Sequence, residues 1–361
     1  LICDINLEFD NQGKIKENYK VKGLIKDAQI KFLKKYDFNN INLNFDFVGK
    51  LIKFKDVSLA FNNTPLLSES ITIKNLNNSF LIEGMIENNG LELKDQLLSN
   101  FIENHFLKFD ITKINLDSKN QFSLRINNNF RINDLKLSSD IKITKLKFKN
   151  NLEIKEFFPN IKKEITLNDH LIKLKFDKSK FSINGKGNIL MQDLEDSMSY
   201  SINKNKSFFD FKTNLLVNKN PIKISFLRYE KKIRSNANID LEGSYNPKKK
   251  TIIKQLSYKE DKNEFRLNQL IFNNNFKIKS LEKFNLQYFD EDLRKNKIKI
   301  LNKNNKYNIV GPKFNANGLI DNLINDDSSD VNIFDQNFNF DIKIDQVYLD
   351  NEYIINNLKG N

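Results

Sequence analysis

The chain has 361 residues and a formal net charge of +13, and lysine makes up nearly all of its 59 basic residues. Surfaces that read nucleic-acid phosphates usually depend on arginine forks, so this composition argues against a nucleic-acid partner, although anionic lipid headgroups stay compatible with it. The single cysteine, Cys3, excludes an internal disulfide, and no apolar run is long enough for a transmembrane helix.

The residue types favour strands over helices. Phenylalanine occurs 31 times, whereas alanine, the best helix former, is found only at Ala28, Ala60, Ala237 and Ala316. We therefore expect a mostly β fold, an elongated antiparallel β-meander curled into an apolar groove, with a few short helices.

Apolar and polar residues alternate along most of the chain, which places every second side chain on one face of a sheet. In chain order, the alternation is found at 41–47, 59–61, 71–73, 124–126, 135–137, 141–143, 146–148, 172–176, 222–226, 239–241, 276–278, 284–286, 298–300 and 338–344. Asparagine pairs such as Asn62-Asn63 and Asn77-Asn78 separate these segments, and asparagine suits tight reversals. Successive strands joined by such turns pair antiparallel.

Three segments have helical spacing instead. We expect a short amphipathic helix near 94–107, a helical turn at 154–161 that stops near Pro159, and a helix at 319–324. The acidic stretch 326–330 that follows is the best loop candidate. We divide the chain into two β-rich segments, 1–180 and 181–361, and expect both ends to be truncated.

Residues that carry chemistry are sparse. His105 and His170 are far apart and have no companion at metal-ligand spacing. The segment 185–187 (GKG) lacks the rest of a phosphate loop, and the acidic residues of 326–330 miss the EF-hand spacing. We therefore expect no catalytic site, no cofactor and no metal.

Several stretches together resemble AsmA-like proteins of Gram-negative envelopes, in particular the large alphaproteobacterial type with a middle domain of unknown function. They are 185–189 (GKGNI) leading to 198–202 (MSYSI), 222–232 (IKISFLRYEKK), 314–323 (FNANGLIDNL), and 338–349 (FNFDIKIDQVYL) followed by 357–360 (NLKG). The specific matches cover roughly the second half of the chain, and their order carries the resemblance more than any single match.

The resemblance implies a repeating β-groove in the periplasm, tethered to the inner membrane by an anchor outside this segment. Its implied partners are phospholipid or another acyl lipid, the inner membrane, and outer-membrane or periplasmic proteins. The implied function is lipid transfer between the inner and outer membranes in support of outer-membrane integrity. This chain departs from the family in lacking the anchor and the usual C-terminal segment.

A sheet that is apolar on one face must cover that face, and acyl chains in an open groove or a closed protein core would both do so. For the groove, one phase of the strands should form the lining. The predicted lining residues are Ile41, Leu43, Phe45, Phe47, Leu59, Phe61, Ile71, Ile73, Ile222, Ile224, Phe226, Phe338, Phe340, Ile342 and Ile344.

Two other classes of function stay open from the sequence. An outer-membrane protein assembly module would present sheet edges to clients by β-augmentation. A structural or adhesive β-rod would have a filled interior. A continuous apolar trough would favour the lipid-conduit hypothesis over both.

Overall fold

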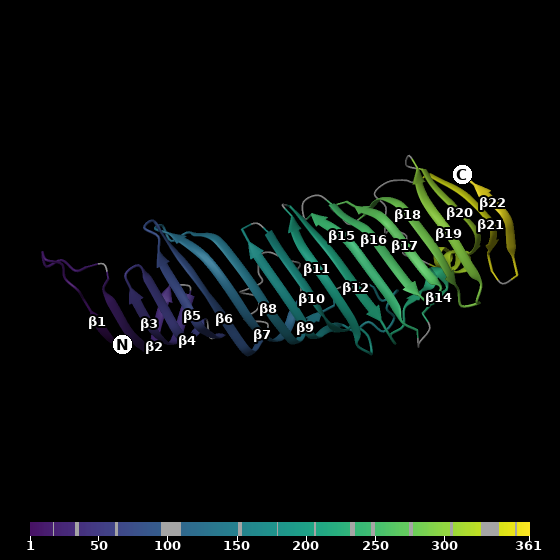
Figure 1. Ribbon diagram of the computed structural model, residues 1–361. Coiled ribbons are helices and arrows are strands. Elements are labelled where there is room, and N and C mark those ends of the chain that lie inside the picture. Colours follow the sequence, from purple (N-terminus) through teal and green to yellow (C-terminus); the bar gives the residue numbers. More distant parts are fainter. Residues whose placement is uncertain are drawn as a thin grey trace. The chain divides into compact units, whose positions relative to one another are not determined.

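The structure is a computed structural model that describes all residues except 17, 33–35, 62–63, 95–109, 151–153, 179, 206, 232–234, 247–249, 274–276, 304–305, 326–338 and 351. Strands account for 76% of the described residues and helices for 3%, and 20 strands belong to one sheet (Figure 1). The predicted mostly β, antiparallel meander is confirmed.

The chain consists of two compact units. Unit 1 contains Leu1–Lys147 and Asp169–Ile183, and unit 2 contains Phe148–Asn168 and Asn184–Asn361. The division expected from the sequence, at 180/181, lies close to the second boundary, while Phe148–Asn168 belongs to unit 2.

Unit 1 is a meander, in which each strand from β1 to β6 pairs antiparallel with the next strand of the chain. Its strands are β1 (Ile2–Asn6), β2 (Lys20–Phe32), β3 (Tyr36–Val48), β4 (Leu51–Phe61), β5 (Thr64–Asn75), β6 (Ser79–Lys94) and β7 (Ile111–Asn127). Three further strands, β8 (Ile132–Lys149), β9 (Glu164–Asp177) and β10 (Lys180–Leu190), contribute residues to both units.

Residues in the left-handed region bend the strands of unit 1. Asp27, Asn40 and Asp56 have φ angles of 53°, 52° and 51°, and the strand register shifts beside each of them. Asparagine side chains bond to the bulged residues: the Asp27 backbone N–H donates to Asn42 Oδ1 at 3.0 Å, and Asn44 Nδ2 donates to Asp56 Oδ2 at 3.0 Å. Since bulges increase local bend and twist, successive strands are bent at neighbouring positions.

Unit 2 continues the meander but contains two departures from it. Its sheet strands are β11 (Asp196–Asn205), β12 (Phe208–Val217), β15 (Ala237–Asn246), β16 (Lys250–Glu260), β17 (Asn263–Phe272), β18 (Ile278–Phe289), β19 (Lys295–Lys303), β20 (Lys306–Asn315), β21 (Asn339–Tyr348) and β22 (Ile354–Gly360). Strand β12 pairs with β15, so the intervening residues leave the sheet. Strands β20 and β21 are parallel, because a long connection containing a helix replaces the expected tight turn.

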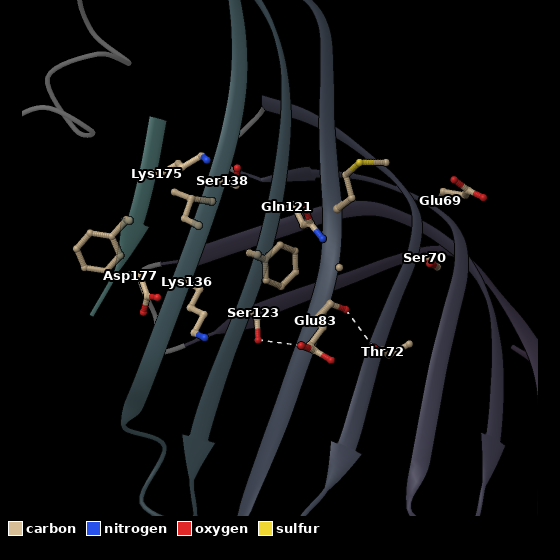
Figure 2. A pocket seen from close by; sticks show the side chains of 15 residues that line it. Glu69, Ser70, Thr72, Glu83, Gln121, Ser123, Lys136, Ser138, Lys175 and Asp177 are labelled. Carbon is tan, nitrogen blue, oxygen red and sulfur yellow. Dashed lines mark hydrogen bonds between the residues drawn. The ribbon is translucent and has the colours of Figure 1, made fainter. Parts of the chain in front are cut away.

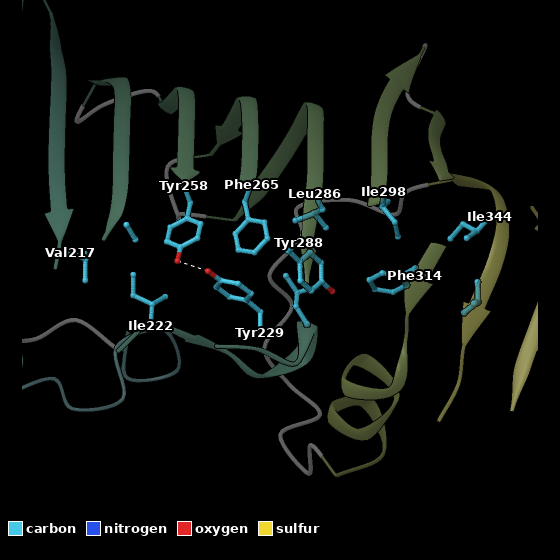
Figure 3. Close-up of a cluster of buried hydrophobic side chains, with 13 residues drawn as sticks. Val217, Ile222, Tyr229, Tyr258, Phe265, Leu286, Tyr288, Ile298, Phe314 and Ile344 are labelled. Carbon is cyan, nitrogen blue, oxygen red and sulfur yellow. Dashed lines mark hydrogen bonds between the residues drawn. The ribbon is translucent and has the colours of Figure 1, made fainter. Parts of the chain in front are cut away.

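The residues that leave the sheet form a cover over one of its faces. They comprise β13 (Lys223–Ile224), the 3₁₀ turn η1 (Ser225–Leu227) and β14 (Tyr229–Glu230), and the helix α2 (Asn317–Asn325) packs against η1. We call β13, η1, β14 and α2 the cover. Figure 3 shows it on one side of a buried cluster, with the sheet strands on the other side.

The helical predictions have three outcomes. The helix at 319–324 is confirmed by α2. At 154–161, the Phe158 backbone N–H donates to the Ile154 carbonyl at 2.9 Å, as in a single helical turn. The predicted helix near 94–107 and the acidic loop 326–330 lie outside the described residues, apart from Lys94 at the end of β6.

Candidate functional site

Two rows of mostly apolar side chains cross unit 1 on one face of its sheet. Directly paired residues of neighbouring strands project to the same side, so the strand register identifies each row. The first row runs through Ile5, Val21, Phe47, Ile52, Ile73, Ile82 and Leu124, one residue from each strand β1–β7. The second contains Phe45, Phe54, Ile71 and Phe122, with Gly23 and Gly84 as further partners. We call these rows the apolar face of unit 1.

The apolar face is long enough to accommodate an extended hydrocarbon chain. Six strand spacings of about 4.8 Å give the first row a length of roughly 29 Å. That length is close to the hydrocarbon thickness of a bilayer, about 30 Å. Neither row contains a charged residue, so no charged side chain in the rows would hold a polar group of a ligand at one position.

All eight lining residues predicted for the first half of the chain lie in unit 1. Phe45 and Ile71 both pair with Phe54, and Phe47 and Ile73 both pair with Ile52, so these four share one face. Ile41 is buried, whereas the other seven are only half-buried. The half-buried ones are Leu43, Phe45, Phe47, Leu59, Phe61, Ile71 and Ile73.

A hollow of 420 Å³ opens on this face near the β3–β4 turn. Phe47 and Ile73 from the predicted set line it together with Tyr19, Ile52 and Phe80. The rings of Tyr19 and Phe47 meet edge to face at 5.3 Å, and Lys50 lies among the turn residues that complete the lining. The lining of this hollow is therefore mostly apolar, with Lys50 and Asn75 among its polar side chains.

A larger hollow, of 810 Å³, is lined mostly by residues of the opposite phase in unit 1 (Figure 2). Thr72, Glu83 and Ser123 form one cross-strand row there, in the phase opposite to Ile73. Ser123 Oγ donates to Glu83 Oε1 at 3.0 Å, and Thr72 Oγ1 donates to the Glu83 carbonyl at 3.3 Å. None of the predicted lining residues takes part in this hollow, whose lining mixes polar side chains with apolar ones such as Met85 and Phe176 and includes Phe122 of the apolar face.

In unit 2 the prediction of a strand at 222–226 is wrong. Only Lys223–Ile224 is extended, and the chain turns into η1 immediately afterwards. Ile222 is buried in the core cluster, and Ile224 and Phe226 pack against the same core. The adjacent apolar residues Phe226 and Leu227, which interrupt the period-two pattern, were the sequence signal for this departure.

The later lining residues lie in β21 or just before it. Ile344 is buried in the core of unit 2 and Ile342 packs against it, so a protein cover already fills the space beside them. Phe340 is 42% exposed, and its ring lies 5.9 Å from that of Tyr307. Phe338 lies outside the described residues.

Buried aromatic rings hold the cover against the sheet. Tyr229, from β14, meets Phe265 and Tyr288 edge to face at 5.0 and 5.9 Å. Its hydroxyl lies 2.6 Å from that of Tyr258 and donates a hydrogen bond to Glu260. Burial raises the pKa of all three tyrosine hydroxyls well above the ordinary range.

Polar groups fix both ends of the segment that contains β13 and β14. Asp196 accepts hydrogen bonds from Asn220 Nδ2 at 2.7 Å and from the Asn218 backbone N–H at 3.0 Å. Lys231 Nζ donates to the Asn218 carbonyl at 2.7 Å. Burial raises the pKa of the Asp196 carboxyl and lowers that of the Lys231 ammonium. These contacts tie the two ends of the segment to each other and to β11.

For the described residues, the expected absence of catalytic and metal chemistry stays a prediction. These residues contain no group of three or more His, Cys, Asp or Glu side chains placed to hold a metal ion. His170 is fully buried in β9, and His105 lies outside the described residues. Of the described helices, none has the length and apolar character needed to cross a membrane.

The chain matches no protein-family model, no curated protein and no solved structure. The resemblance to AsmA-like proteins therefore depends only on the sequence segments given above.

Proposed function

We propose that the apolar face of unit 1 binds the acyl chains of a phospholipid or another acyl lipid, and that the protein carries lipid along this face. The observation that carries the proposal is the pair of apolar rows across β1–β7, whose members are mostly half-buried. A folded protein seldom leaves such a surface to water unless it has a ligand or partner.

Acyl chains suit this face better than a polar ligand does. Each buried methylene contributes about 0.8 kcal/mol, so a two-tailed lipid gains several kcal/mol from partial contact. Side chains such as Phe47, Ile52 and Ile73 have no polar tip that would fix the lipid in one place. Contacts of similar strength therefore repeat from strand to strand, and an acyl chain can slide along the row.

At the level of the cell, we propose a lipid conduit between the inner and outer membranes that supports outer-membrane integrity. This proposal places the protein in the periplasm, tethered to the inner membrane by a segment outside this sequence. Its support is the resemblance to AsmA-like proteins together with the apolar face. The covered face of unit 2 is not part of the proposed route.

Two measurements test the proposal. Native mass spectrometry of the purified chain should detect bound phospholipid. A photo-crosslinking residue at position 73 should then form lipid adducts, while one at position 72 should not, because Thr72 projects from the opposite face. Adducts at both positions, or at neither, would show that the apolar face is not the lipid site.

A further inference from the structure

Six basic side chains lie on one face of β17–β22 in unit 2. The strand register joins Arg266, Asn285, Lys299, Val310, Lys343 and Lys359 into one row, with one residue from each strand. Lys297 and Lys313 pair directly in the neighbouring row. We call Arg266, Lys297, Lys299, Lys313, Lys343 and Lys359 the basic band.

The band faces solvent, on the side of the sheet opposite the core. Along β19, Lys297 and Lys299 alternate with Ile298, which is buried in the core cluster. Lys343 likewise precedes the buried Ile344. Because the pleat alternates sides, the band and the cover lie on opposite faces.

Two pairs in the band place like charges directly opposite each other. Lys297 faces Lys313 across β19 and β20, and Lys343 faces Lys359 across β21 and β22. Directly opposed like charges in a sheet are destabilising. The two pairs therefore lower the stability of the sheet at this surface. Such a cost is expected where an anionic partner neutralises the lysines.

Carboxylates on the same face do not offset this charge. Glu264 binds Arg266 at 2.6 Å, and Asp341 binds Lys306 at 3.2 Å. Within the described part of the chain, Lys297, Lys299, Lys313 and Lys343 form no ion pair, although the exposed Asp345 lies two residues from Lys343. Their ammonium groups are therefore available to a partner.

We propose that the basic band binds the surface of an anionic membrane through lipid headgroup phosphates. The band spans six strands, or roughly 24 Å at about 4.8 Å a strand, and so presents many separate point charges instead of one pocket. A hollow of 400 Å³ beside Lys297 and Lys299 is also lined by Val310 and Pro312, which offers apolar contact between the charges.

The residue types favour headgroups over nucleic acid. Five of the six cations are lysines, which act as point charges, whereas sequence reading and bidentate phosphate binding favour arginine. The proposal does not rest on lipid binding by unit 1, because it concerns headgroup charge and not acyl chains.

Vesicle cosedimentation tests the proposal with the whole chain. Vesicles of phosphatidylcholine alone are compared with vesicles that also contain phosphatidylglycerol, in dilute buffer and at about 1 M salt, where the Debye length falls to about 3 Å. The band variant combines Lys297→Gln, Lys299→Gln and Lys313→Gln. The matched control combines Lys136→Gln, Lys142→Gln and Lys173→Gln, three exposed lysines of unit 1 that give the same change in net charge.

The wild-type chain and the control should bind the anionic vesicles and be released by salt. The band variant should bind roughly a hundredfold more weakly, at about 1 kcal/mol for each lost charge. Its melting temperature should not fall, because one like-charge pair is removed. Equal losses in the two variants, salt-resistant binding, or binding to acidic polypeptide without binding to vesicles would overturn the proposal. Binding to the two kinds of vesicle without distinction would likewise overturn it, while leaving the acyl-chain proposal untouched.

Discussion

The two units are built from strands of the same kind, but they differ in how the apolar face of those strands is covered. In unit 1 the buried apolar side chains among the described residues are Ile41, Val57, Ile114 and Ile143. In unit 2 a single cluster contains 13 buried residues, because the cover closes over it. The difference teaches that strand periodicity determines which face is apolar, whereas residues outside the strands determine what covers that face.

The largest effect that separates the units should come from a carboxylate on each apolar face. Ile222→Asp buries a charge inside the closed core of unit 2 and should cost about 5 kcal/mol or more of unfolding free energy. Ile73→Asp places the same group on a half-buried site of unit 1, where water can still reach it, and should cost about 2 kcal/mol or less. Urea denaturation followed by circular dichroism measures both.

Lipid binding gives the second readout of that comparison. Ile73→Asp should abolish co-purification of lipid while most of the sheet stays folded. If Ile73→Asp unfolds unit 1 as completely as Ile222→Asp unfolds unit 2, then unit 1 also has a closed core, and the open-face interpretation is wrong.

Alkaline pH should weaken unit 2 through its three buried tyrosines. Burial raises the pKa of Tyr229, Tyr258 and Tyr288, so the folded state keeps three protons that the unfolded chain releases above a pH of about 10. Their stabilisation is thus fully present below that pH and is lost as the pH rises. Above that pH, each tyrosine lowers the free energy of unfolding by up to about 1.4 kcal/mol per pH unit. The three together lower it by roughly 4 kcal/mol per pH unit.

The measurement for this prediction is chemical denaturation at several alkaline pH values. Tyr288→Phe is the matched control, because the Tyr288 hydroxyl has no hydrogen-bond partner within the described part of the chain. It should reduce the pH slope by about a third and leave the stability at neutral pH nearly unchanged. An unaltered slope would mean that Tyr288 ionises in the folded state.

The sequence predicted part of the strands of unit 1, because apolar and polar residues alternate clearly within β3, β4, β5 and β7, whereas β2 and β6 contain none of the predicted segments. Phe47 and Ile73 were placed in one phase, and the register joins them through Ile52. The same reasoning failed at Ile222, since an alternating segment packs equally well on a core as within a sheet. The parallel pairing of β20 and β21 was also missed, because it depends on where α2 packs. Lipid binding by the predicted residues stays a prediction.

A smaller effect should come from the contact between α2 and η1. A Cβ atom on Gly318 would lie 2.7 Å from the Ser225 carbonyl oxygen and 3.0 Å from that of Phe226. Gly318→Ala should therefore push α2 away from η1 and cost about 1–3 kcal/mol, despite the better helix propensity of alanine. Gly360→Ala is the control, since its Cβ would meet nothing within 4 Å. Thermal denaturation compares the melting temperatures of the two variants. Equal melting temperatures would contradict the packing argument.

The smallest effect concerns the polar face, where alternation alone makes every asparagine look replaceable. Asn42 accepts the Asp27 backbone N–H at a bulge, at 3.0 Å, whereas Asn339 is exposed at the start of β21. Asn42→Ala should leave that N–H without its partner and cost about 1 kcal/mol, while Asn339→Ala should change stability by much less. Hydrogen exchange at the Asp27 amide reports the local loss directly. If that amide exchanges equally fast in the wild type and in Asn42→Ala, the side chain does not support the bulge, and the bend of β2 and β3 must come from backbone pairing alone.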